Sequence, residues 1–453
     1  MYLTIMLGSL LVMAMDNKLL FVVSMMALKV GLDLRGTSIG ASSRKAKRTG
    51  ITIQIDCICS ELKEIEMKLE GIRVLDLSLF LPGPLLTQMM ADHGADVVKL
   101  EPRGAGEPNR SIGQTRNGVS VYFSNTHRGK RSVQLDLKNA EGKALALKLA
   151  ASADVVIEAF RPGVVERLGM SYEQIKAINP GVVYASLSAF GQTGPYVKKP
   201  AHDLATEAYA GVLSANLGFD GKPAIPALPA ADMLAATIGL SAVLMALLRK
   251  KDTGEGDYVD LAMMDSLIAC LPNSMGSVFA DKKPPAIEDE RIWGGYAMYN
   301  IYETKDKKFV VLGASEIHFA ESVLKKFGRE DLVPLCEPPP GKNQEPVREF
   351  FREQFVRQNQ SYWVKWFDDV DAAFAPVNDL RQGMDDPQTR FREMIIEDSE
   401  GNEHIGIPIK FQNEPGSVNF AAPGLGEHNR EVALSLGYSD LEVDDLKRSG
   451  AFG

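Results

Sequence analysis

The 453-residue sequence is poor in cysteine, and its four cysteines do not form a metal-binding pattern. The Cys57-x-Cys59 pair is too closely spaced for the usual zinc loop, and Cys270 and Cys336 stand far from it and from each other. A small secreted domain held by disulfides would need a denser pattern. We therefore expect no metal site and a reducing, cytoplasmic compartment.

The sequence also lacks an excess of positive charge. The formal net charge is −9, whereas a nucleic-acid binder needs an excess of Lys and Arg on one face to neutralise phosphates. The composition thus argues against a nucleic-acid partner, and an anionic ligand would need a local basic pocket. With 45% hydrophobic and 24% charged residues, the chain has the composition of an ordinary globular protein, long enough for two domains.

The N-terminal region has no uninterrupted apolar run that could span a bilayer. Asp16, Lys18 and Lys29 interrupt the apolar segment 1–32, whereas a membrane helix needs about 18 to 20 consecutive apolar residues. The segment also lacks the basic start and the cleavage site of a signal peptide. A basic stretch, GASSRKAKRTG, follows, and the sequence restarts cleanly at MKLEGIRVLDLS. We expect residues 1–66 to be a leader that is a non-native upstream extension, and we expect no membrane contact. A membrane anchor is the alternative.

Alternating strand and helix patterns begin at Gly71. The branched apolar run Ile72–Leu77, a Pro-Gly-Pro turn, a helical stretch and a second run, ADVVKLE, form a strand–helix–strand unit. Segments 153–158 and 181–187 repeat the strand pattern, with helical segments before each. These units predict an α/β fold, a Rossmann-like layer with a parallel sheet. The first turn, LSLFLPGPLL, lacks G-x-G-x-x-G, which argues against a nicotinamide or flavin dinucleotide.

Changes in the sequence pattern predict the domain organisation. Residues 67–265 carry the α/β pattern and form the large domain, and residues 266–290 form a linker. Residues 291–385 form a smaller α+β domain, with strands around a Lys/Asp turn and an amphipathic helix over 349–368. Residues 386–453 contain prolines and glycines before a final helical piece.

A single acid stands between a proline-alanine stretch and an apolar helix in PALPAADMLAATIG, residues 226–239. Taken alone, this stretch of sequence predicts that Asp232 is the N-cap of a helix over Met233–Leu248, because an Asp side chain accepts hydrogen bonds from the first free backbone N–H groups. A chemical role is the alternative. The nearest cationic residues in the sequence are Lys222 and Arg249, too distant along the chain to indicate a partner.

Seven segments carry a family resemblance: GIRVLDLSLFLPGPLLTQMMADHGADVVKLEP, NTHRGKRSVQLDLK, EAFRPGVVERLGM, ASLSAFGQTGPY, AHDLATEAYAG, PAADMLAATIGLSAVLMALL and TGEGDYVDLAMMDS. In this order they resemble the class III CoA-transferases (CaiB/BaiF family), which include formyl-CoA transferase, carnitine CoA-transferase and α-methylacyl-CoA racemase. The resemblance runs from about Leu69 to the C-terminus.

The resemblance implies a fold and a set of partners. The large domain would be built from both ends of the chain, so that residues 386–453 return to it, and two chains would interlock as rings in a homodimer. Such an intertwined dimer buries more surface than an ordinary docking interface. The family implies an acyl-CoA and a carboxylic acid acceptor as partners, with coenzyme A as part of the substrate and no permanently bound cofactor.

The resemblance also assigns Asp232 a chemical role. It aligns with the nucleophilic aspartate of the transferases. That carboxylate attacks an acyl-CoA thioester to give a mixed anhydride, and the released CoA thiolate then attacks the aspartyl carbonyl to leave an aspartyl-CoA thioester, the covalent intermediate. A carboxylate without a strong cationic partner suits this role.

The racemase branch of the family offers a second interpretation. His202, in PAHDL, and Asp232 would be two bases on opposite faces of the α-carbon of a 2-methylacyl-CoA, with the thioester oxygen stabilised as an enolate. Glu316, in LGASE, resembles the racemase glutamate that contacts that histidine. Gly294-Gly295 is shorter than the glycine-rich flap that is common in transferases. A structural role for His202, and acyl-CoA binding without catalysis, are further alternatives.

The anionic nucleotide of CoA needs cations, with Arg favoured for bidentate phosphate contacts. By resemblance, Arg167 contacts the nucleotide end and Phe160 lies beside the adenine. The resemblance adds the CoA-contacting candidates Lys130, Arg131, Leu135, Lys138 and Pro82, together with Arg103, whose neighbour Pro102 occupies the matching basic position. Any of the basic residues could instead be a solvated surface charge.

Overall fold

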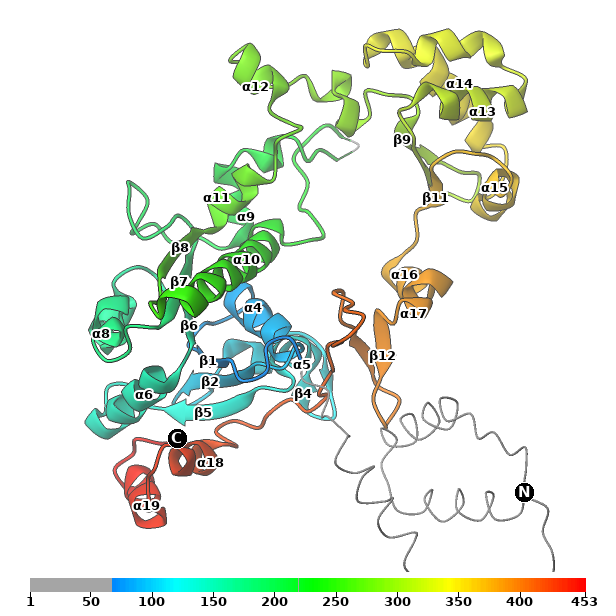
Figure 1. Ribbon diagram of the computed structural model, residues 1–453. Coiled ribbons are helices and arrows are strands. Elements are labelled where there is room, and N and C mark those ends of the chain that lie inside the picture. Colours follow the sequence, from blue (N-terminus) through cyan, green and yellow to red (C-terminus); the bar gives the residue numbers. More distant parts are fainter. Residues whose placement is uncertain (1–66, 219) are drawn as a thin grey trace, which may run out of the picture. The chain divides into compact units, whose positions relative to one another are not determined.

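The computed structural model describes residues 67–218 and 220–453 (Figure 1). The predicted leader, residues 1–66, lies outside the described residues. The largest sheet has six parallel strands in the order β5-β2-β1-β6-β7-β8. Its strands are β1 (Arg73–Asp76), β2 (Asp96–Pro102), β5 (Arg131–Leu135), β6 (Val155–Glu158), β7 (Val183–Ser188) and β8 (Tyr258–Ala262).

The chain leaves the centre of this sheet in two directions. From β1 it runs outward through β2 to β5, then crosses to the other side of β1 at β6 and continues through β7 to β8. The strand order therefore reverses between β1 and β6. Because all strands are parallel, their carboxyl ends meet at one edge, and in open α/β sheets ligands bind at the reversal point on that edge.

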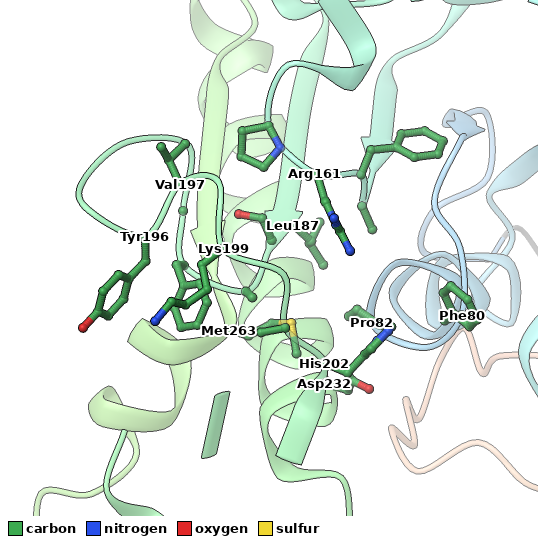
Figure 2. A pocket seen from close by; sticks show the side chains of 18 of the residues that line it. Phe80, Pro82, Arg161, Leu187, Tyr196, Val197, Lys199, His202, Asp232 and Met263 are labelled. Carbon is green, nitrogen blue, oxygen red and sulfur yellow. The ribbon is translucent and has the colours of Figure 1, made fainter. Parts of the chain in front are cut away.

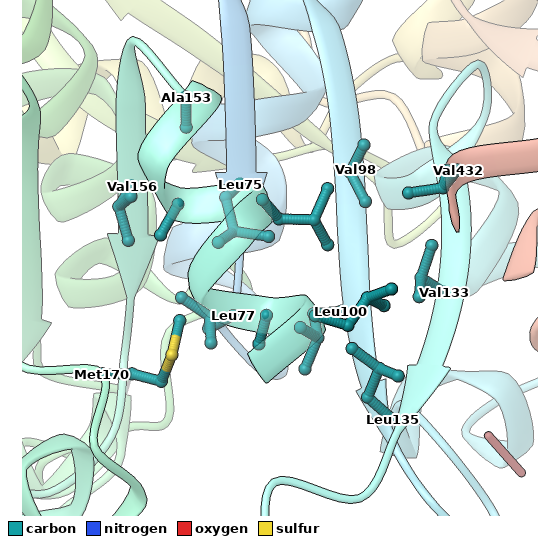
Figure 3. Packing of buried hydrophobic residues seen from close by; sticks show 14 of the residues in the cluster. Leu75, Leu77, Val98, Leu100, Val133, Leu135, Ala153, Val156, Met170 and Val432 are labelled. Carbon is teal, nitrogen blue, oxygen red and sulfur yellow. The ribbon is translucent and has the colours of Figure 1, made fainter. Parts of the chain in front are cut away.

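Helices cover both faces of the sheet and bury two apolar cores. The helices α4 (Pro82–Ala91) and α10 (Ala230–Thr253) pack on one face, with Val74 of β1 in that core. On the other face, Leu75 of β1 joins a second core with α6 (Ala140–Ser152), as Figure 3 shows. Successive strand residues point to opposite faces, so two neighbouring residues of β1 belong to different cores.

The helix α10 has two apolar sides. By length and composition it could cross a membrane, with a mean hydropathy of 2.0 over its most apolar window, but a core helix meets the same criterion. One side is buried against the sheet through Ala236, Leu240, Val243 and Leu247. The other side exposes Leu244, Met245 and Leu248, the latter two by about two thirds of their surface (66% and 67%).

A second group of elements has its own sheet and core. The strands β9 (Tyr299–Glu303), β10 (Phe309–Gly313) and β11 (Phe374–Pro376) pair antiparallel. They pack with the helices α13 (Ile317–Phe327), α14 (Glu345–Phe355) and α15 (Gln360–Phe367) around an aromatic-rich core. Two-stranded antiparallel sheets are formed by β3 (Thr115–Arg116) with β4 (Val119–Ser120) and by β12 (Ile395–Glu397) with β13 (Glu403–Ile405).

The single helix predicted over residues 349–368 is wrong, because the chain breaks there into α14 and α15. The Nε1–H of Trp363 donates to the carbonyl oxygen of Phe355 at 2.9 Å. The two rings pack edge to face with centroids 5.0 Å apart. A continuous helix could not bring these side chains together across the break, so tertiary packing overrides the helical periodicity of the sequence.

The C-terminal segment packs on the large sheet. The helices α18 (Asn429–Ser435) and α19 (Asp440–Arg448) contribute Val432 and Leu446 to the same core as Leu75, and Phe452 bridges to Leu135 at the end of β5. Shorter helices lie between the main elements: α5 (Val121–His127), α7 (Val164–Leu168), α8 (Tyr172–Lys176), α9 (Asp203–Tyr209), α11 (Met263–Ala269), α12 (Gly276–Ala280), α16 (Leu380–Asp385) and α17 (Pro387–Phe391).

The predicted α/β class is confirmed: the fold combines a parallel sheet of six strands with small antiparallel sheets. The predicted domain boundaries, at residues 67–265, 266–290, 291–385 and 386–453, stay predictions, as does the interlocked homodimer.

Candidate active site

A cavity of about 300 Å³ lies at the carboxyl edge of the parallel sheet (Figure 2). Its walls come from the segments that follow β1, β6 and β7, together with the starts of α9, α10 and α11. The cavity therefore lies where the strand order reverses, the expected ligand position in such a sheet. Its lining includes Phe80, Pro82, Phe160, Arg161, His202 and Asp232.

Asp232 is not the N-cap of α10, so the capping prediction is wrong. The helix begins at Ala230, with Pro229 at the cap position, and Asp232 is its third residue. The free N–H groups of the first turn are bound by acids of α9 instead. Asp203 Oδ1 accepts from the backbone N–H of Ala231 at 2.8 Å and of Asp232 at 3.2 Å.

Glu207 completes this capping from α9: its Oε1 accepts from the backbone N–H of Ala230 at 3.1 Å. Because two acids of a neighbouring helix bind the start of α10, the Asp232 side chain is not needed as a cap. It is available to the cavity.

The Asp232 side chain favours its neutral, protonated form more strongly in the protein than it would in water. Burial raises its pKa to about 7, and the negative charge of Asp203 adds to the shift. Among the ion pairs of the described residues, none involves Asp232. A carboxylate of raised pKa without a cationic partner is more basic and more nucleophilic than an ordinary surface Asp.

His202 lies in the same cavity wall as Asp232. Its backbone is at the N-cap of α9, but its side chain makes no capping hydrogen bond. Its ring packs edge to face on Phe80, with centroids 5.7 Å apart and planes at 81°. The structure thus brings together the two residues that the sequence selected as candidate bases.

Phe80 adopts a left-handed backbone conformation, with φ at 64°, which is unfavourable for a bulky residue. Its N–H donates to Glu107 Oε1 at 2.9 Å, and its carbonyl accepts from the side-chain amide of Asn109. These contacts hold the strained residue with its ring against His202. Backbone strain of this kind is common at functional sites.

Three of the predicted CoA-binding residues lie at or near this edge of the sheet. Pro82 and Phe160 line the cavity. Arg167 is exposed in the last turn of α7, close after the loop that carries Phe160. Arg161, which the sequence did not single out, also lines the cavity. Neither arginine takes part in an ion pair or hydrogen bond with another of the residues that the structure describes, so both are free for an anion.

The structure does not bring the other CoA-binding candidates to the cavity. The Lys130 side chain is fully buried, with its Nζ 3.1 Å from Asp76 Oδ2, and burial lowers the pKa of Lys130 to about 8. Arg131 starts β5 at the opposite edge of the sheet and pairs with Asp96 at 2.6 Å. Leu135 belongs to the apolar core.

Lys138 and Arg103 are exposed and do not line the cavity. Arg103 donates to the carbonyl oxygen of Gly450 at 3.1 Å. Glu316 is exposed at the N-cap of α13, beside the antiparallel sheet, and within residues 67–453 no hydrogen bond joins it to His202. These three predicted roles receive no support from the geometry.

Sequence reasoning missed several residues of the site. Asp203 and Glu207 are spaced four residues apart in DLATE, so they share a helix face, which was a usable signal. Arg161 lies one residue after Phe160 in the quoted segment EAFRPGVVERLGM. No sequence pattern indicates Phe80, because nothing in the sequence predicts a left-handed backbone conformation at a phenylalanine. Tyr122 lies near Asp232, and burial with the Asp232 charge raises the pKa of Tyr122 to about 12.

Comparison with known proteins identifies the family. The sequence profile of CoA-transferase family III matches residues 69–429. The chain is 31% identical to an acyl-CoA transferase of Fusarium pseudograminearum over 84% of this chain and 88% of that protein. It is also 31% identical to the succinyl-CoA–D-citramalate CoA-transferase of Chloroflexus aurantiacus, over 84% and 97% of the two chains.

A solved structure gives the same result. The crystal structure of a CAIB/BAIF family protein from Brucella suis superposes with a TM-score of 0.72 at 26% identity, covering 82% of this chain and all of that one (100%). The chain therefore belongs to CoA-transferase family III, as the sequence segments predicted, and is an enzyme of that family. Members of this family act on CoA thioesters.

Proposed function

We propose that the chain transfers CoA from an acyl-CoA to a carboxylic acid through a covalent aspartyl-CoA thioester on Asp232. The observation that supports this best is the Asp232 carboxyl in the cavity wall, with no cationic partner among the described residues and with its helix start already capped by α9. A salt-bridged or capping carboxylate would be a poorer nucleophile.

The reaction follows from that carboxylate. An ionised Asp232 oxygen attacks the thioester carbonyl, the C–S bond breaks, and a mixed anhydride and CoA thiolate result. The thiolate attacks the aspartyl carbonyl and expels the acyl group as a free carboxylate, which leaves the aspartyl-CoA thioester. The acceptor carboxylate then attacks this thioester, the C–S bond breaks, and a second anhydride and CoA thiolate result. The thiolate attacks the acceptor carbonyl and expels Asp232 as a free carboxylate, which gives the new acyl-CoA.

CoA is held, in this proposal, by residues beside the cavity. Arg161 and Arg167 provide guanidinium groups that are unpaired among the described residues, and guanidinium groups suit bidentate phosphate contacts. Phe160 supplies an aromatic surface for the adenine, and Pro82 packs nearby. Lys130 is not included, because its ammonium group is already bound by Asp76.

A second candidate activity is racemisation of a 2-methylacyl-CoA. It is supported by one observation, the presence of His202 and Asp232 in the wall of the same cavity. It would need the two groups on opposite sides of the substrate α-carbon. A chain that binds acyl-CoA without catalysis is less consistent with an acid of raised pKa in the cavity.

The exposed outer side of α10 supports a homodimer. Leu244, Met245 and Leu248 form an apolar stripe that a second copy of the chain would cover, as the interlocked arrangement of the family implies. We propose such a dimer in the cytoplasm. Size-exclusion chromatography with light scattering checks its mass.

Two measurements test the reaction. Incubation with succinyl-CoA and subsequent treatment with borohydride should modify Asp232, as found by peptide mass spectrometry; absence of any adduct contradicts the transferase mechanism. Incubation of the same protein with 2-methylacyl-CoA in D₂O, without an acceptor acid, should give no α-deuteration, whereas rapid deuteration would establish racemisation. Asp232→Ala should abolish transfer, while Asp252→Ala, an exposed acid at the far end of α10, serves as the matched control.

A further inference from the structure

Three carboxyl groups meet at the start of α10. Asp203 and Glu207 lie one turn apart on α9 and bind the first backbone N–H groups of α10, and Asp232 lies in that first turn. Among the described residues, none of the three takes part in an ion pair. Three negative charges so close together repel one another, so a proton on one of them is favoured.

Glu207 is the most deeply buried of the three carboxyl groups. It is fully buried (0% exposed), and within the described part of the chain its single hydrogen bond from the backbone goes to Oε1. Its Oε2 receives no hydrogen bond from any donor in the described chain. A buried ionised carboxylate with one donor and no cation is strongly disfavoured.

Asp203 has the opposite character. Its Oδ1 accepts two backbone N–H groups at the positive end of α10, so this oxygen acts as an acceptor and is not the donor of the pair. Its carboxyl also lies within hydrogen-bonding reach of Glu207, and two carboxyl groups can bond only if one carries a proton. Burial and the Asp203 charge both raise the pKa of Glu207.

We propose that Glu207 is a protonated positioning residue, whose carboxylic O–H donates to the carboxylate of Asp203 so that the pair fixes the first turn of α10. Each acid then has a distinct task. Glu207 is protonated and accepts a hydrogen bond from the Ala230 N–H. Asp203 accepts from the N–H groups of Ala231 and Asp232, and the Asp232 side chain faces the cavity. The role in catalysis rests on the proposed function of Asp232, but the protonation of Glu207 does not.

The proposal makes glutamine a close substitute and leucine a poor one. In Glu207→Gln, the amide carbonyl can accept from the Ala230 N–H and the NH₂ group can donate to Asp203, as the protonated acid does. Glu207→Leu fills similar space but provides neither bond. An ionised Glu207 would predict similar losses in both variants, because neither glutamine nor leucine replaces a negative charge.

Difference infrared spectroscopy tests the proton directly. Asp232→Asn should serve as the parent protein, because Asp232 is itself partly protonated near neutral pH. At pH 7.5 the difference between its spectrum and that of the same protein with Glu207→Gln should contain the carbonyl stretch of a buried carboxylic acid, shifted in D₂O. The other buried acid of raised pKa, Glu158, contributes equally to both spectra. An unchanged spectrum on adding Glu207→Gln would overturn the proposal.

Kinetics test the positioning role. Glu207→Gln should keep kcat within about threefold of the wild type, whereas Glu207→Leu should lower kcat by about 10- to 100-fold with little change in KM for the acyl-CoA, because a misplaced nucleophile reacts slowly. Glu173→Leu on the exposed side of α8 is the control. Equal loss in the Gln and Leu variants would contradict the proposal.

CoA transfer through Asp232 and the protonation of Glu207 can be disproved independently of each other. If Asp232→Ala retained CoA transfer, the proposed function would be wrong, yet the infrared result would still decide the state of Glu207. If the Leu variant did not fold, shown by loss of its cooperative thermal transition, the infrared measurement on the Gln variant would still give a decisive result.

Discussion

The backbone N–H of Asp232 donates to Asp203 Oδ1 at 3.2 Å, so a carboxylate on one helix holds the start of the helix that carries the candidate nucleophile. The same contact places a negative charge beside the Asp232 side chain. Asp203 therefore acts on Asp232 in two ways: it fixes the position of its backbone and raises the pKa of its carboxyl group.

The pH dependence of aspartyl-CoA formation should report the Asp232 carboxyl. Its pKa is raised to about 7, first by burial and then by the charge of Asp203, so the rate should rise as pH increases through about 7 and level off above it. In Asp203→Asn the amide oxygen can still accept the two N–H groups, but the charge is gone. The acid limb should move to lower pH by on the order of one unit. Single-turnover rates from pH 5 to 9 measure it, and an unmoved limb would count against this electrostatic coupling.

Asp232→Asn should stabilise the protein while it abolishes transfer. Because the folded-state pKa is raised, the folded protein binds more protons than the unfolded chain between about pH 4 and 7, so this carboxyl lowers stability as pH rises through that range. Removing it should increase the free energy of unfolding by about 1–2 kcal/mol at pH 8 and by close to nothing at pH 4. Urea unfolding at both pH values checks the difference. A variant less stable at pH 8 would contradict the assignment.

Asp76 is expected to be a structural residue. Burial alone would raise its pKa, but the ammonium groups of Lys99 and Lys130 outweigh burial and hold the pKa of Asp76 well below its usual range. Asp76→Asn removes the anion that Lys130 pairs with and leaves Lys99 with Glu107, so it should cost about 3–5 kcal/mol at pH 7. A depressed pKa means that this stabilisation is present above about pH 4 and is lost on further acidification.

The surface pair of Asp96 with Arg131 provides the control for Asp76. Both side chains are partly exposed (44% and 26%), so Asp96→Asn should cost less than about 1 kcal/mol. Chemical denaturation of the two variants under the same conditions makes the comparison. Equal losses would show that burial does not distinguish the two pairs.

Arg161→Met should weaken acyl-CoA binding. The guanidinium lines the cavity and has no protein partner among the described residues, so its loss should raise KM for the acyl-CoA by about tenfold, with a smaller effect on kcat and little change in stability. Arg131→Met, at the opposite edge of the sheet, should leave KM unchanged. Steady-state kinetics with one acyl-CoA and increasing salt measure both. If Arg131→Met raised KM and Arg161→Met did not, CoA would have to bind elsewhere.

Local patterns were sufficient for much of the fold. Branched apolar runs such as Ile72–Leu77 predicted the strands because a strand buried on both faces needs apolar residues at successive positions. The helix over 349–368 was wrong because its periodicity could not reveal that Trp363 folds back onto Phe355. Ordered segments were also sufficient for the family and for selecting Asp232 and His202.

Tertiary structure alone decided what each charged side chain does. Nothing in the sequence around Lys130 distinguishes a CoA contact from a buried partner of Asp76, 54 positions away, because ion pairs depend on distance in space. Likewise, the local pattern around Asp232 predicts a cap, and only the fold places Asp203 and Glu207 of α9 at that helix start instead. The sequence by itself determined the fold class, the family and the candidate nucleophile, since these depend on local pattern and order. The protonation and partners of the acids were decided by burial and by neighbours from distant parts of the chain, which only folding creates.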